Sequence, residues 1–528
     1  MERIILENVV KYFGDRKILE IAEWKVSEGE KIGIVGNNGI GKSTLLNLIA
    51  RKVNPDSGTI KVKGDLTYIE QIEESNENLS SGEKRKQQIN RSFQSNSAII
   101  LADEPSSHLD IKAREYLEKQ LEKFKGTLLM ISHDRQLLDA VCNSIIEIEK
   151  GKIKKYKGNY SEYQLQKEHY MQRKQFEYSQ YVQEKQKLEK AIHQTKNTAK
   201  KMKKTPSRMG NSEARLHKRE AENKKEKIEK HSKELEARLN QLEEKEQPEK
   251  EYHIYMRLPK NRKIKSKYLL TCENLSLQVG SKILLQDVKF QIFTNSKTVL
   301  IGENGCGKTS LLKRIIQNDK KLIWNPNVKI GYYDQEFQNL DESMSILENV
   351  LENSSYSEIE IRNILANMNI KGKEVEKRVS VLSGGEKAKV SLAKILTSDS
   401  NFLILDEPTN FLDIVSIEAV QKMIKNYMGT VLLVTHDRRL IDSVATHILL
   451  VENKKIVQFE GNYSQYLESK RQKDFKESNE QLLLKMKLAQ LDSQLAFCKD
   501  EKEKEKLEEQ YWSLKEILDI YGLDAKVK

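Results

Sequence analysis

This chain has few residues that could form disulfides or metal sites, and it lacks any long apolar run. Its four cysteines lie far apart, so we interpret them as free, reduced thiols, and its nine histidines form no ligand cluster. No run of about 18 apolar residues is present, which argues against a membrane span. The first residues, "MERIILENVV", lack the basic and apolar regions of a secretory signal. These absences favour a cytoplasmic protein. The cysteines are Cys142, Cys272, Cys306 and Cys498.

Positive charge exceeds negative charge along the 528 residues. The chain has 91 lysines and arginines against 79 aspartates and glutamates, a formal net charge of +12. Such an excess favours a polyanionic partner, either a nucleic acid or an anionic membrane surface. Charge alone is a weak indication, because many lysine-rich proteins have no such partner. The length is sufficient for about two to four domains.

The chain contains one domain twice. Blocks of sequence recur in the same order in its two halves, which indicates a tandem duplication. In each copy short apolar runs alternate with helical patterns, so we predict α/β domains whose strands are buried on both faces. The paired blocks are "KIGIVGNNGIGKSTLLNLI" (31–49) with "KTVLIGENGCGKTSLLKRI" (297–315), "NLSSGEKRK" (78–86) with "VLSGGEKAK" (381–389), "AIILADEPSSHLD" (98–110) with "FLILDEPTNFLD" (402–413), "LLMISHDRQLLD" (128–139) with "LLVTHDRRLID" (432–442), and "YKGNYSEY" (156–163) with "FEGNYSQY" (459–466).

The stretch between the copies has a different texture. Glycine is nearly absent from residues 164–250, and lysine, glutamate and glutamine dominate. Because Pro206 and Gly210 cannot continue a helix, we predict an antiparallel helical hairpin with a loop at its tip rather than a disordered linker. Apolar residues at heptad-like spacings support the two arms: Tyr181, Leu188 and Ile192 before the loop, and Ile228, Leu235, Leu239 and Leu242 after it.

Each copy also has a glycine-rich loop between a strand and a helix. Both loops fit the pattern G-x-x-x-x-G-K-[ST], in which backbone N–H groups surround phosphate oxygens at the positive end of a helix. The lysine then reaches the β- and γ-phosphates, and the following hydroxyl binds Mg²⁺. Two matches in this context argue strongly against an incidental turn. The predicted nucleotide-binding residues are Gly36, Asn37, Asn38, Gly39, Gly41, Lys42, Ser43 and Thr44 in the first copy, and Gly302, Glu303, Asn304, Gly305, Gly307, Lys308, Thr309 and Ser310 in the second.

An acidic pair ends an apolar strand in each copy. Asp103 and Asp406 are placed to hold Mg²⁺, usually through water, while Glu104 and Glu407 are placed to polarise the attacking water. The alternative is an exposed acidic pair at a strand end. The phosphate loop upstream and the histidine downstream argue against it.

The order of these motifs resembles that of the ATP-binding cassette ATPases: Walker A, glutamine, L-S-x-G-E signature, Walker B, D-loop and histidine, present twice. The resemblance implies that two cassettes face head to tail and that each ATP lies between the Walker A of one and the signature of the other. Asp110 and Asp413 match the D-loop aspartates. One implied site combines Lys42, Ser43, Gln71, Asp103, Glu104 and His133 with Ser383, Gly384 and Gly385. The other combines Lys308, Thr309, Gln335, Asp406, Glu407 and His436 with Ser80, Ser81 and Gly82.

Within this resemblance, Glu104, Glu407, His133 and His436 are the expected catalytic residues. Ser43, Gln71, Asp103, Thr309, Gln335 and Asp406 are the expected Mg²⁺ ligands.

The first copy departs from the family pattern at three places. Ser81 stands where the signature usually has glycine, and its side chain could crowd the phosphate. Phe13 could stack on adenine, but the second copy has no aromatic in the corresponding region. Only seven residues separate Gln71 from Leu79, against forty-six between Gln335 and Leu382, so we expect the first cassette to lack most of its helical subdomain. Two sites that hydrolyse ATP, with unequal rates, remain the expectation.

Two tandem cassettes, the "GNYSxY" exits and a charged helical linker resemble the ABC-F family of ribosome-associated ATPases. The resemblance implies cassette 1 at 1–163, a hairpin linker at 164–266 with a basic tip near 204–216, cassette 2 at 267–466 and a helical extension at 467–528. The short interval in the first cassette leaves no room for the arm of housekeeping members. This favours the antibiotic-resistance branch, typified by the Vga-like proteins of Gram-positive bacteria, which protect ribosomes from lincosamides, streptogramins A and pleuromutilins.

The basic tip is the predicted contact with the ribosome. Residues 190–219 contain ten lysines and arginines and one acid, Glu213, a one-signed charge suited to phosphate; a solubilising surface is the alternative. The implied partners are the 70S ribosome, with 23S rRNA, the P-site tRNA and the E site. A regulatory translation factor, and an ATP-gated clamp on nucleic acid or protein, remain open alternatives. The predicted contact residues are Lys203, Lys204, Arg208, Met209, Arg215 and Lys218.

Overall fold

The computed structural model describes residues 1–70, 81–95, 97–201, 211–245, 264–334, 336–497 and 507–515. The chain separates into two compact units that are interleaved in sequence, since short segments of the first repeat belong to the second unit. The first unit comprises Met1–Gln71, Arg91–Pro105 and Gln120–His253. The second comprises Ile72–Asn90, Ser106–Lys119 and Ile254–Lys528.

The first repeat is built on a mainly parallel sheet with the strand order β5-β6-β7-β3-β8-β9, in which only β9 runs antiparallel to its neighbour. Its central strands are mainly apolar and almost entirely buried, as expected of strands covered on both faces. An antiparallel sheet of order β2-β1-β4 packs with it in one core. The strands are β1 (Glu2–Phe13), β2 (Arg16–Ser27), β3 (Lys31–Val35), β4 (Ser57–Val62), β5 (Leu66–Ile69), β6 (Ile99–Asp103), β7 (Thr127–Ile131), β8 (Ser144–Glu149) and β9 (Lys152–Lys157).

The second repeat has the same topology. Its main sheet has the order β14-β15-β16-β12-β17-β18, and its small antiparallel sheet has the order β11-β10-β13. The tandem α/β architecture predicted from the repeated blocks is therefore confirmed. The strands are β10 (Tyr268–Val279), β11 (Lys282–Phe293), β12 (Lys297–Gly302), β13 (Leu322–Trp324), β14 (Ile330–Tyr333), β15 (Phe402–Asp406), β16 (Thr430–Val434), β17 (His447–Glu452) and β18 (Lys455–Glu460).

Four helices of each repeat occupy matching places in the order of elements. The first repeat has α1 (Lys42–Ile49), α2 (Ser81–Gln94), α3 (Ile111–Lys123) and α4 (Arg135–Val141). The second has α7 (Lys308–Ile316), α10 (Gly384–Leu396), α11 (Ile414–Asn426) and α12 (Arg438–Val444).

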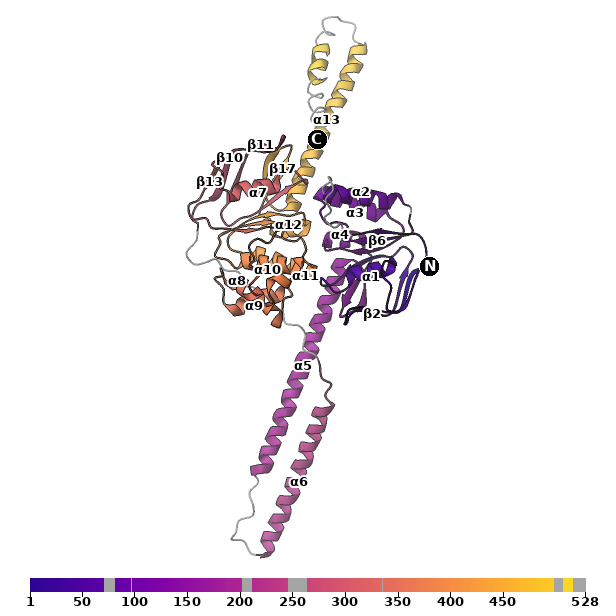
Figure 1. Cartoon of the computed structure of the whole chain (residues 1–528), viewed down its shortest axis with the longest axis vertical. Helices are drawn as coiled ribbons and strands as arrows, with labels where there is room; N and C mark the ends of the chain where they lie inside the picture. The colour runs from indigo at the N-terminus through magenta and orange to yellow at the C-terminus, as the bar shows by residue number, and fades with distance from the viewer. Residues whose placement is uncertain are drawn as a thin grey trace. The chain divides into compact units, whose positions relative to one another are not determined.

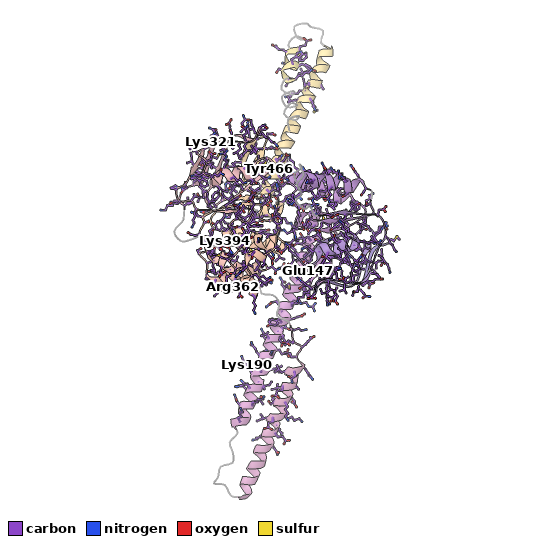
Figure 2. All side chains as sticks on the ribbon, in the orientation of Figure 1. Glu147, Lys190, Lys321, Arg362, Lys394 and Tyr466 are labelled. Atoms are coloured by element: carbon purple, nitrogen blue, oxygen red, sulfur yellow. The ribbon has the colours of Figure 1, made fainter. Side chains whose placement is uncertain are left out.

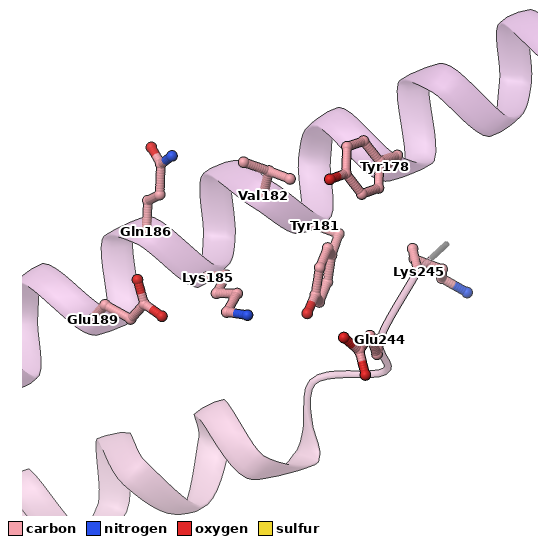
Figure 3. Close-up of a pocket in the computed structure, with 8 residues that line it drawn as sticks. All are labelled: Tyr178, Tyr181, Val182, Lys185, Gln186, Glu189, Glu244 and Lys245. Carbon is pink, nitrogen blue, oxygen red and sulfur yellow. The ribbon is translucent and has the colours of Figure 1, made fainter. Parts of the chain in front are cut away.

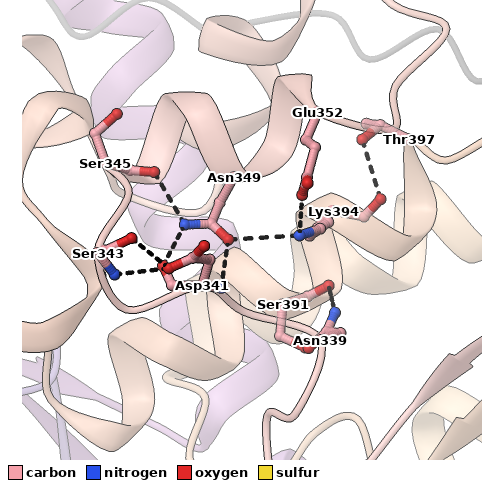
Figure 4. A network of polar contacts seen from close by, with 9 residues as sticks. All are labelled: Asn339, Asp341, Ser343, Ser345, Asn349, Glu352, Ser391, Lys394 and Thr397. Atoms are coloured by element: carbon pink, nitrogen blue, oxygen red, sulfur yellow. Dashed lines mark hydrogen bonds and ion pairs between the residues drawn. The ribbon is translucent and has the colours of Figure 1, made fainter.

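The second repeat has additional helical structure between β14 and α10. It consists of α8 (Ile346–Leu351), α9 (Glu358–Asn367) and two 3₁₀ turns, Gly372–Glu376 and Val379–Val381. A polar network ties α8 to the signature helix α10 (Figure 4): Lys394 Nζ lies 2.8 Å from Glu352 and 3.5 Å from the side-chain oxygen of Asn349. The Asn349 amide also donates to the carbonyl oxygen of Asp341 at 2.8 Å, and Asn349 itself is fully buried. The first repeat has only residues 70–80 between β5 and α2.

The linker is a hairpin of two long helices, α5 (Tyr160–Lys201) and α6 (Asn211–Gln241), which lie side by side in Figure 1. They run antiparallel, because Lys196 near the end of α5 pairs with Glu236 of α6 at 2.7 Å, while Tyr178 lies near Glu244. The predicted apolar seam is confirmed: Ile192 is buried, and the other seam residues are half-buried. Helix α5 begins at Tyr160, inside the range expected for the first cassette.

The helix α13 (Tyr463–Phe497) follows the second repeat and likewise begins before the expected boundary. Leu488 and Leu491 of this helix are buried, and residues 507–515 are helical. Within the described ranges no helix is long and apolar enough to cross a membrane.

Candidate nucleotide-binding sites

The glycine-rich loop of the first repeat joins β3 to α1 and is shaped by glycines in left-handed conformations. Gly36, Gly39 and Gly41 have φ of 149°, 72° and 107°. A Cβ atom on Gly41 would lie 2.6 Å from the Ile18 side chain, so this position requires glycine. Lys42 is buried, and its Nζ donates to the carbonyl oxygen of Gly36 at 2.7 Å. The ammonium group therefore lies at the centre of the loop, where a phosphate chain would be bound.

The loop of the second repeat has the same geometry. Gly305 and Gly307 have φ of 74° and 105°, values close to those of their counterparts. Lys308 is buried and donates to the carbonyl oxygens of Gly302 at 2.9 Å and Glu303 at 3.0 Å. The loop residues predicted from the sequence are thus brought together around one ammonium group in each repeat.

Each acidic pair stands at the carboxyl end of a buried central strand, β6 or β15. Asp103 and Asp406 are buried, and the glutamates that follow them adopt left-handed backbone conformations, with φ of 48° at Glu104 and 50° at Glu407. Such conformations are costly for a side chain larger than glycine and concentrate at functional sites. Here they are held by backbone hydrogen bonds, since the amide of Glu104 donates to Ile131 O at 2.9 Å and that of Glu407 donates to Val434 O at 2.8 Å.

The predicted histidines face these glutamates. His133 Nε2 lies 3.4 Å from Glu104 Oε1, and His436 Nε2 lies 3.5 Å from Glu407 Oε1. Both histidines follow the strand next to the acidic strand, so the topology of the parallel sheet brings them together. The pairing of glutamate with histidine in each repeat is a contact that the motif order alone could not establish.

Burial changes the protonation of the second pair. It raises the pKa of Glu407 to about 7; the charge of Asp406 acts in the same direction, while Arg114 and Lys308 oppose it. Burial, with the charges of Lys308 and Arg114, lowers the pKa of His436 to about 2, so the imidazole is neutral near pH 7. A carboxyl group that titrates near pH 7 is suited to accept a proton from water.

Asp406 has a second partner suited to cation binding. Burial raises its pKa, and a hydrogen bond from the Thr309 hydroxyl opposes that rise. The hydroxyl and carboxylate predicted to bind Mg²⁺ thus lie together in the second repeat. Among the described residues no cluster of three or more His, Cys, Asp or Glu side chains could hold a metal alone. A cation here would therefore need oxygens from nucleotide or water, which is how Mg²⁺ is usually bound.

The two D-loop aspartates cap the helices that follow them. Asp413 accepts from the backbone of Ser416 at 2.8 Å and pairs with Lys389 at 2.7 Å, with both charged groups buried. Burial opposes ionisation of Asp413, but the charge and hydrogen bond of Lys389, together with hydrogen bonds from Ser416, hold the pKa below its ordinary value. Asp110 accepts from the backbone of Ala113 at 2.9 Å, and its carboxylate lies 4.0 Å from Lys86.

Sequence reasoning missed these lysines, although the repeat contained a signal. Lys86 and Lys389 occupy the same place in "GEKRK" and "GEKAK", six residues after the signature serine. They tie each signature helix to its own D-loop.

The signature and glutamine residues are only partly described. Ser383 caps α10 and shares a reciprocal capping box with Glu386, while Gly384 and Gly385 form its first turn. Gln71, Gln335 and Ser80 lie outside the described residues. Ser81 and Gly82 lie in α2, but their side chains are also outside the description.

The remaining predicted nucleotide-binding residues lie in the first loop, at the start of the helices that follow the loops, or at the surface. Asn37 and Asn38 lie in the first loop, Ser43 and Thr44 follow Lys42 in α1, and Ser310 follows Thr309 in α7. Phe13 is 55 % exposed at the end of β1, with Lys11 Nζ 5.8 Å from its ring centre, so a stacking role for it stays a prediction.

Little of the structure around the residues predicted to contact the ribosome is described. Lys203, Lys204, Arg208 and Met209 lie outside the described residues. Arg215 and Lys218 lie in α6, without described side chains.

A pocket of about 820 Å³ opens between the hairpin helices, away from the glycine-rich loops (Figure 3). Tyr178 and Tyr181 form one wall, while Lys185 and Lys245 are balanced by Glu189 and Glu244. Because its charges cancel, this pocket does not resemble an anion site.

The two loops meet the requirements of a nucleotide. Each provides backbone donors in a turn with glycines at positive φ, a buried ammonium group and a buried carboxylate at the end of an adjacent part of the sheet. ATP therefore fits both repeats. Bound Mg²⁺ would neutralise phosphate charge there, with Ser43 and Asp103, or Thr309 and Asp406, as the side chains available to hold it.

Known proteins share these features. The profile of the family described as "ABC transporter" matches residues 19–73 and 285–410, and a second profile with the same description matches residues 146–231. The erythromycin resistance ATP-binding protein MsrA of Staphylococcus epidermidis is 36% identical over 460 residues, which cover 82% of this chain and 94% of MsrA. The ribosome protection protein VmlR of Bacillus subtilis (strain 168) is 28% identical over 483 residues, covering 86% of this chain and 88% of VmlR.

A solved structure has a similar fold. The RNase-L inhibitor matches with a TM-score of 0.58 at 18% identity and covers 88% of this chain and 93% of its own. At that identity the likeness shows the fold alone. The identity to MsrA over most of both chains, with two complete sets of cassette motifs and a matched extension, shows that this chain is an ATPase of the ABC-F family of ATP-binding cassette proteins.

Proposed function

We propose that this ATPase acts on the ribosome and protects its large subunit from antibiotics. The observation that carries the proposal is the hairpin of α5 and α6, because a long helical projection between two nucleotide-binding repeats has no part in hydrolysis itself. Its sequence concentrates lysine and arginine in residues 190–219, as contact with RNA phosphates requires. The names of MsrA and VmlR, which refer to drug resistance and ribosome protection, support this reading.

The nucleotide sites supply the energy. Lys42 and Lys308 hold the phosphates of ATP, while Glu104 and Glu407 accept a proton from the attacking water. His133 and His436 keep these carboxylates in place, and the signature of one cassette completes the site of the other. ATP binding then favours a form that engages the ribosome, and hydrolysis releases it.

The hairpin tip is the proposed working end. Lys203, Lys204, Arg208, Met209, Arg215 and Lys218 would approach 23S rRNA and the P-site tRNA from the E site, so that drug bound near the peptidyl-transferase centre is released. Lincosamides, streptogramins A and pleuromutilins are the proposed drugs. The name of MsrA adds erythromycin to those that must be tested.

Growth of a sensitive bacterium expressing the chain tests the proposal. The minimal inhibitory concentration of erythromycin, or of a member of at least one of the three proposed drug classes, should rise at least fourfold. Arg208→Ala combined with Met209→Ala should abolish the rise while leaving ATP hydrolysis intact. If no drug tolerance changes although the protein sediments with ribosomes, a regulatory translation factor is the better description. If it does not sediment with ribosomes in a nonhydrolysable ATP analogue, the ribosome assignment is wrong.

The order of steps has a separate test. Glu104→Gln combined with Glu407→Gln should trap the protein on ribosomes in ATP, because binding persists when hydrolysis is blocked. Sedimentation no greater than that of the unaltered protein would contradict this order.

A further inference from the structure

Polar side chains tie the first turns of α5 to α4 and to β8 of the first repeat, at two places outside the nucleotide loops. We propose that these contacts make α5 a rigid extension of the first cassette, so that the hairpin keeps one orientation on it in all nucleotide states. Asp139 and Glu147 are the positioning residues. The proposal depends on the proposed function only for what the hairpin acts upon.

The first attachment joins α4 to the start of α5. Both carboxylate oxygens of Asp139 accept hydrogen bonds from Ser161, one from its backbone N–H at 2.6 Å and one from its hydroxyl at 2.7 Å. Helix α4 begins two residues after His133, and its N-cap Asp134 accepts from the backbone of Gln136 and Leu137. One short helix therefore connects the residue facing Glu104 to the root of the hairpin.

The second attachment lies one to two turns further along α5. Glu147 of β8 is 8 % exposed, and its carboxylate forms an ion pair with Lys167 of α5 and accepts from the Tyr156 hydroxyl at 3.0 Å. Tyr163 of α5 is also buried and packs edge to face on the Tyr156 ring, with 4.9 Å between ring centres. Figure 2 labels Glu147 at this root and Lys190 further along α5.

These contacts span the place where a hinge would otherwise form. Gly158 lies two residues before the helix and adopts a left-handed φ of 101°, a conformation open mainly to glycine. Its amide donates to Asn143 O at 3.0 Å. Rotation about Gly158 would have to break the Asp139–Ser161 bonds and pull Lys167 away from Glu147, which would leave a largely buried carboxylate without its cation.

The root of α13 provides an internal comparison. Asp442 accepts from the backbone of Ser464 at 3.0 Å, so the first attachment is repeated. The second is repeated only in its aromatic contact: Phe459 packs edge to face on Tyr466, with 5.7 Å between ring centres, but Leu450 stands where the first repeat has Glu147. Lys470, the counterpart of Lys167, lies 3.9 Å from Glu452 and is half exposed. A polar attachment to a largely buried carboxylate thus occurs at the root of the hairpin and not at that of α13.

Pulsed electron spin resonance can measure this rigidity. Spin labels would replace exposed Glu23 of β2 and exposed Lys190 of α5 through a noncanonical amino acid, which leaves the native cysteines in place. Residue 190 lies about 45 Å along the helix from Tyr160, so a small rotation at the root displaces the label widely. Distances would be recorded in ADP and in a nonhydrolysable ATP analogue, without ribosomes.

We expect the unaltered protein to give one narrow distance distribution with the same mean in both nucleotides. Asp139→Ala with Glu147→Ala should at least double its width while basal ATP hydrolysis stays within twofold. The matched control Asp442→Ala should leave the width unchanged. If the double variant does not fold, Asp139→Asn with Tyr156→Phe provides a milder test, since it keeps one acceptor for Ser161 and should widen the distribution less.

Two results would overturn the proposal: a mean distance in the unaltered protein that moves with nucleotide, or a width that the joint variants leave unchanged. Because no ribosome is present, failure of the ribosome proposal would not affect this measurement.

Discussion

The two cassettes differ more in what supports their signature helices than in their glycine-rich loops and acidic strand ends. Both have the same strand order, glycine-rich loop and pairing of glutamate with histidine. In the second, α8 and α9 pack beside α10 and the Lys394–Asn349 network joins them. In the first, only residues 70–80 stand between β5 and α2.

This difference shows that the loops predicted to bind ATP can stay the same while the structure that supports the signature helix changes. The atoms that bind phosphate are fixed by loops and strand ends, which a short interval elsewhere does not disturb. The signature helix depends on its neighbours. In the second cassette the Lys394–Asn349 network holds it, whereas in the described part of the first cassette much less helical structure lies beside it. Both lysines that pair with the D-loops remain, but Lys389 is buried while Lys86 is half exposed.

The largest effect should come from removing the catalytic carboxylates. Glu104→Gln with Glu407→Gln should lower kcat for ATP hydrolysis by about 100-fold or more, because loss of a general base typically costs 10²–10⁴-fold. Phosphate release measures this. Each single variant then reports the activity of the other site, and equal residual rates would contradict the expected inequality. Glu358→Gln, at the exposed start of α9, is the control.

The next largest effect should come from removing Lys394 from the polar network that joins α8 to α10. Lys394→Ala leaves the Asn349 side chain and Glu352 without this partner, so we expect a loss of about 1–3 kcal/mol in the free energy of unfolding. Calorimetry should show the melting of the second cassette lowered by several degrees. Arg91→Ala, the matching position in α2, is exposed and should change little. Equal losses would mean that the two signature helices are supported alike.

The pH dependence of ATP turnover should differ from that expected for a general base with the ordinary pKa of glutamate. With a pKa raised by burial to about 7, Glu407 is the active base above pH 7 and becomes protonated as the pH falls through 7. Turnover in the Glu104→Gln background should therefore fall about tenfold for each pH unit below 7. Steady-state rates between pH 5.5 and 8.5 measure this. A rate that stays flat down to pH 5.5 would show that Glu407 titrates at its ordinary value.

The smallest effect should come from exchanging the signature residues. A Cβ atom on Gly384 would meet nothing within 4 Å, so Gly384→Ser should leave the melting temperature unchanged. Any cost must then arise from crowding of the bound phosphate, and we expect a reduction in ATP turnover of a few fold. Ser81→Gly should give the reverse. If neither exchange alters turnover, the serine in the first signature has no bearing on the rates.

Much of the site could be predicted because its signals are local. A glycine pattern between a strand and a helix defines a phosphate loop, and apolar seams at heptad-like spacings on either side of a loop define a hairpin. The pairs Asp139–Ser161, Glu147–Lys167 and Lys389–Asp413 could not be predicted, since residues 20 or more positions apart meet only through folding. The repeated lysine of "GEKRK" and "GEKAK" was present in the sequence, but nothing local marked its partner.

The sequence by itself determined the duplication, the cassette chemistry and the existence of the hairpin, because each follows from residue types at short spacings. The tertiary structure decided how these residues behave. Lys297 shows why: burial lowers its pKa to about 8, and it donates at 2.6 Å to the carbonyl oxygens of Tyr427 and Gly429, more than 120 residues away. Desolvation, and the charges that oppose or reinforce it, depend on what surrounds a group in space. For the same reason, only the folded chain shows that Glu407 titrates near pH 7 and that α5 is tied to α4 and β8.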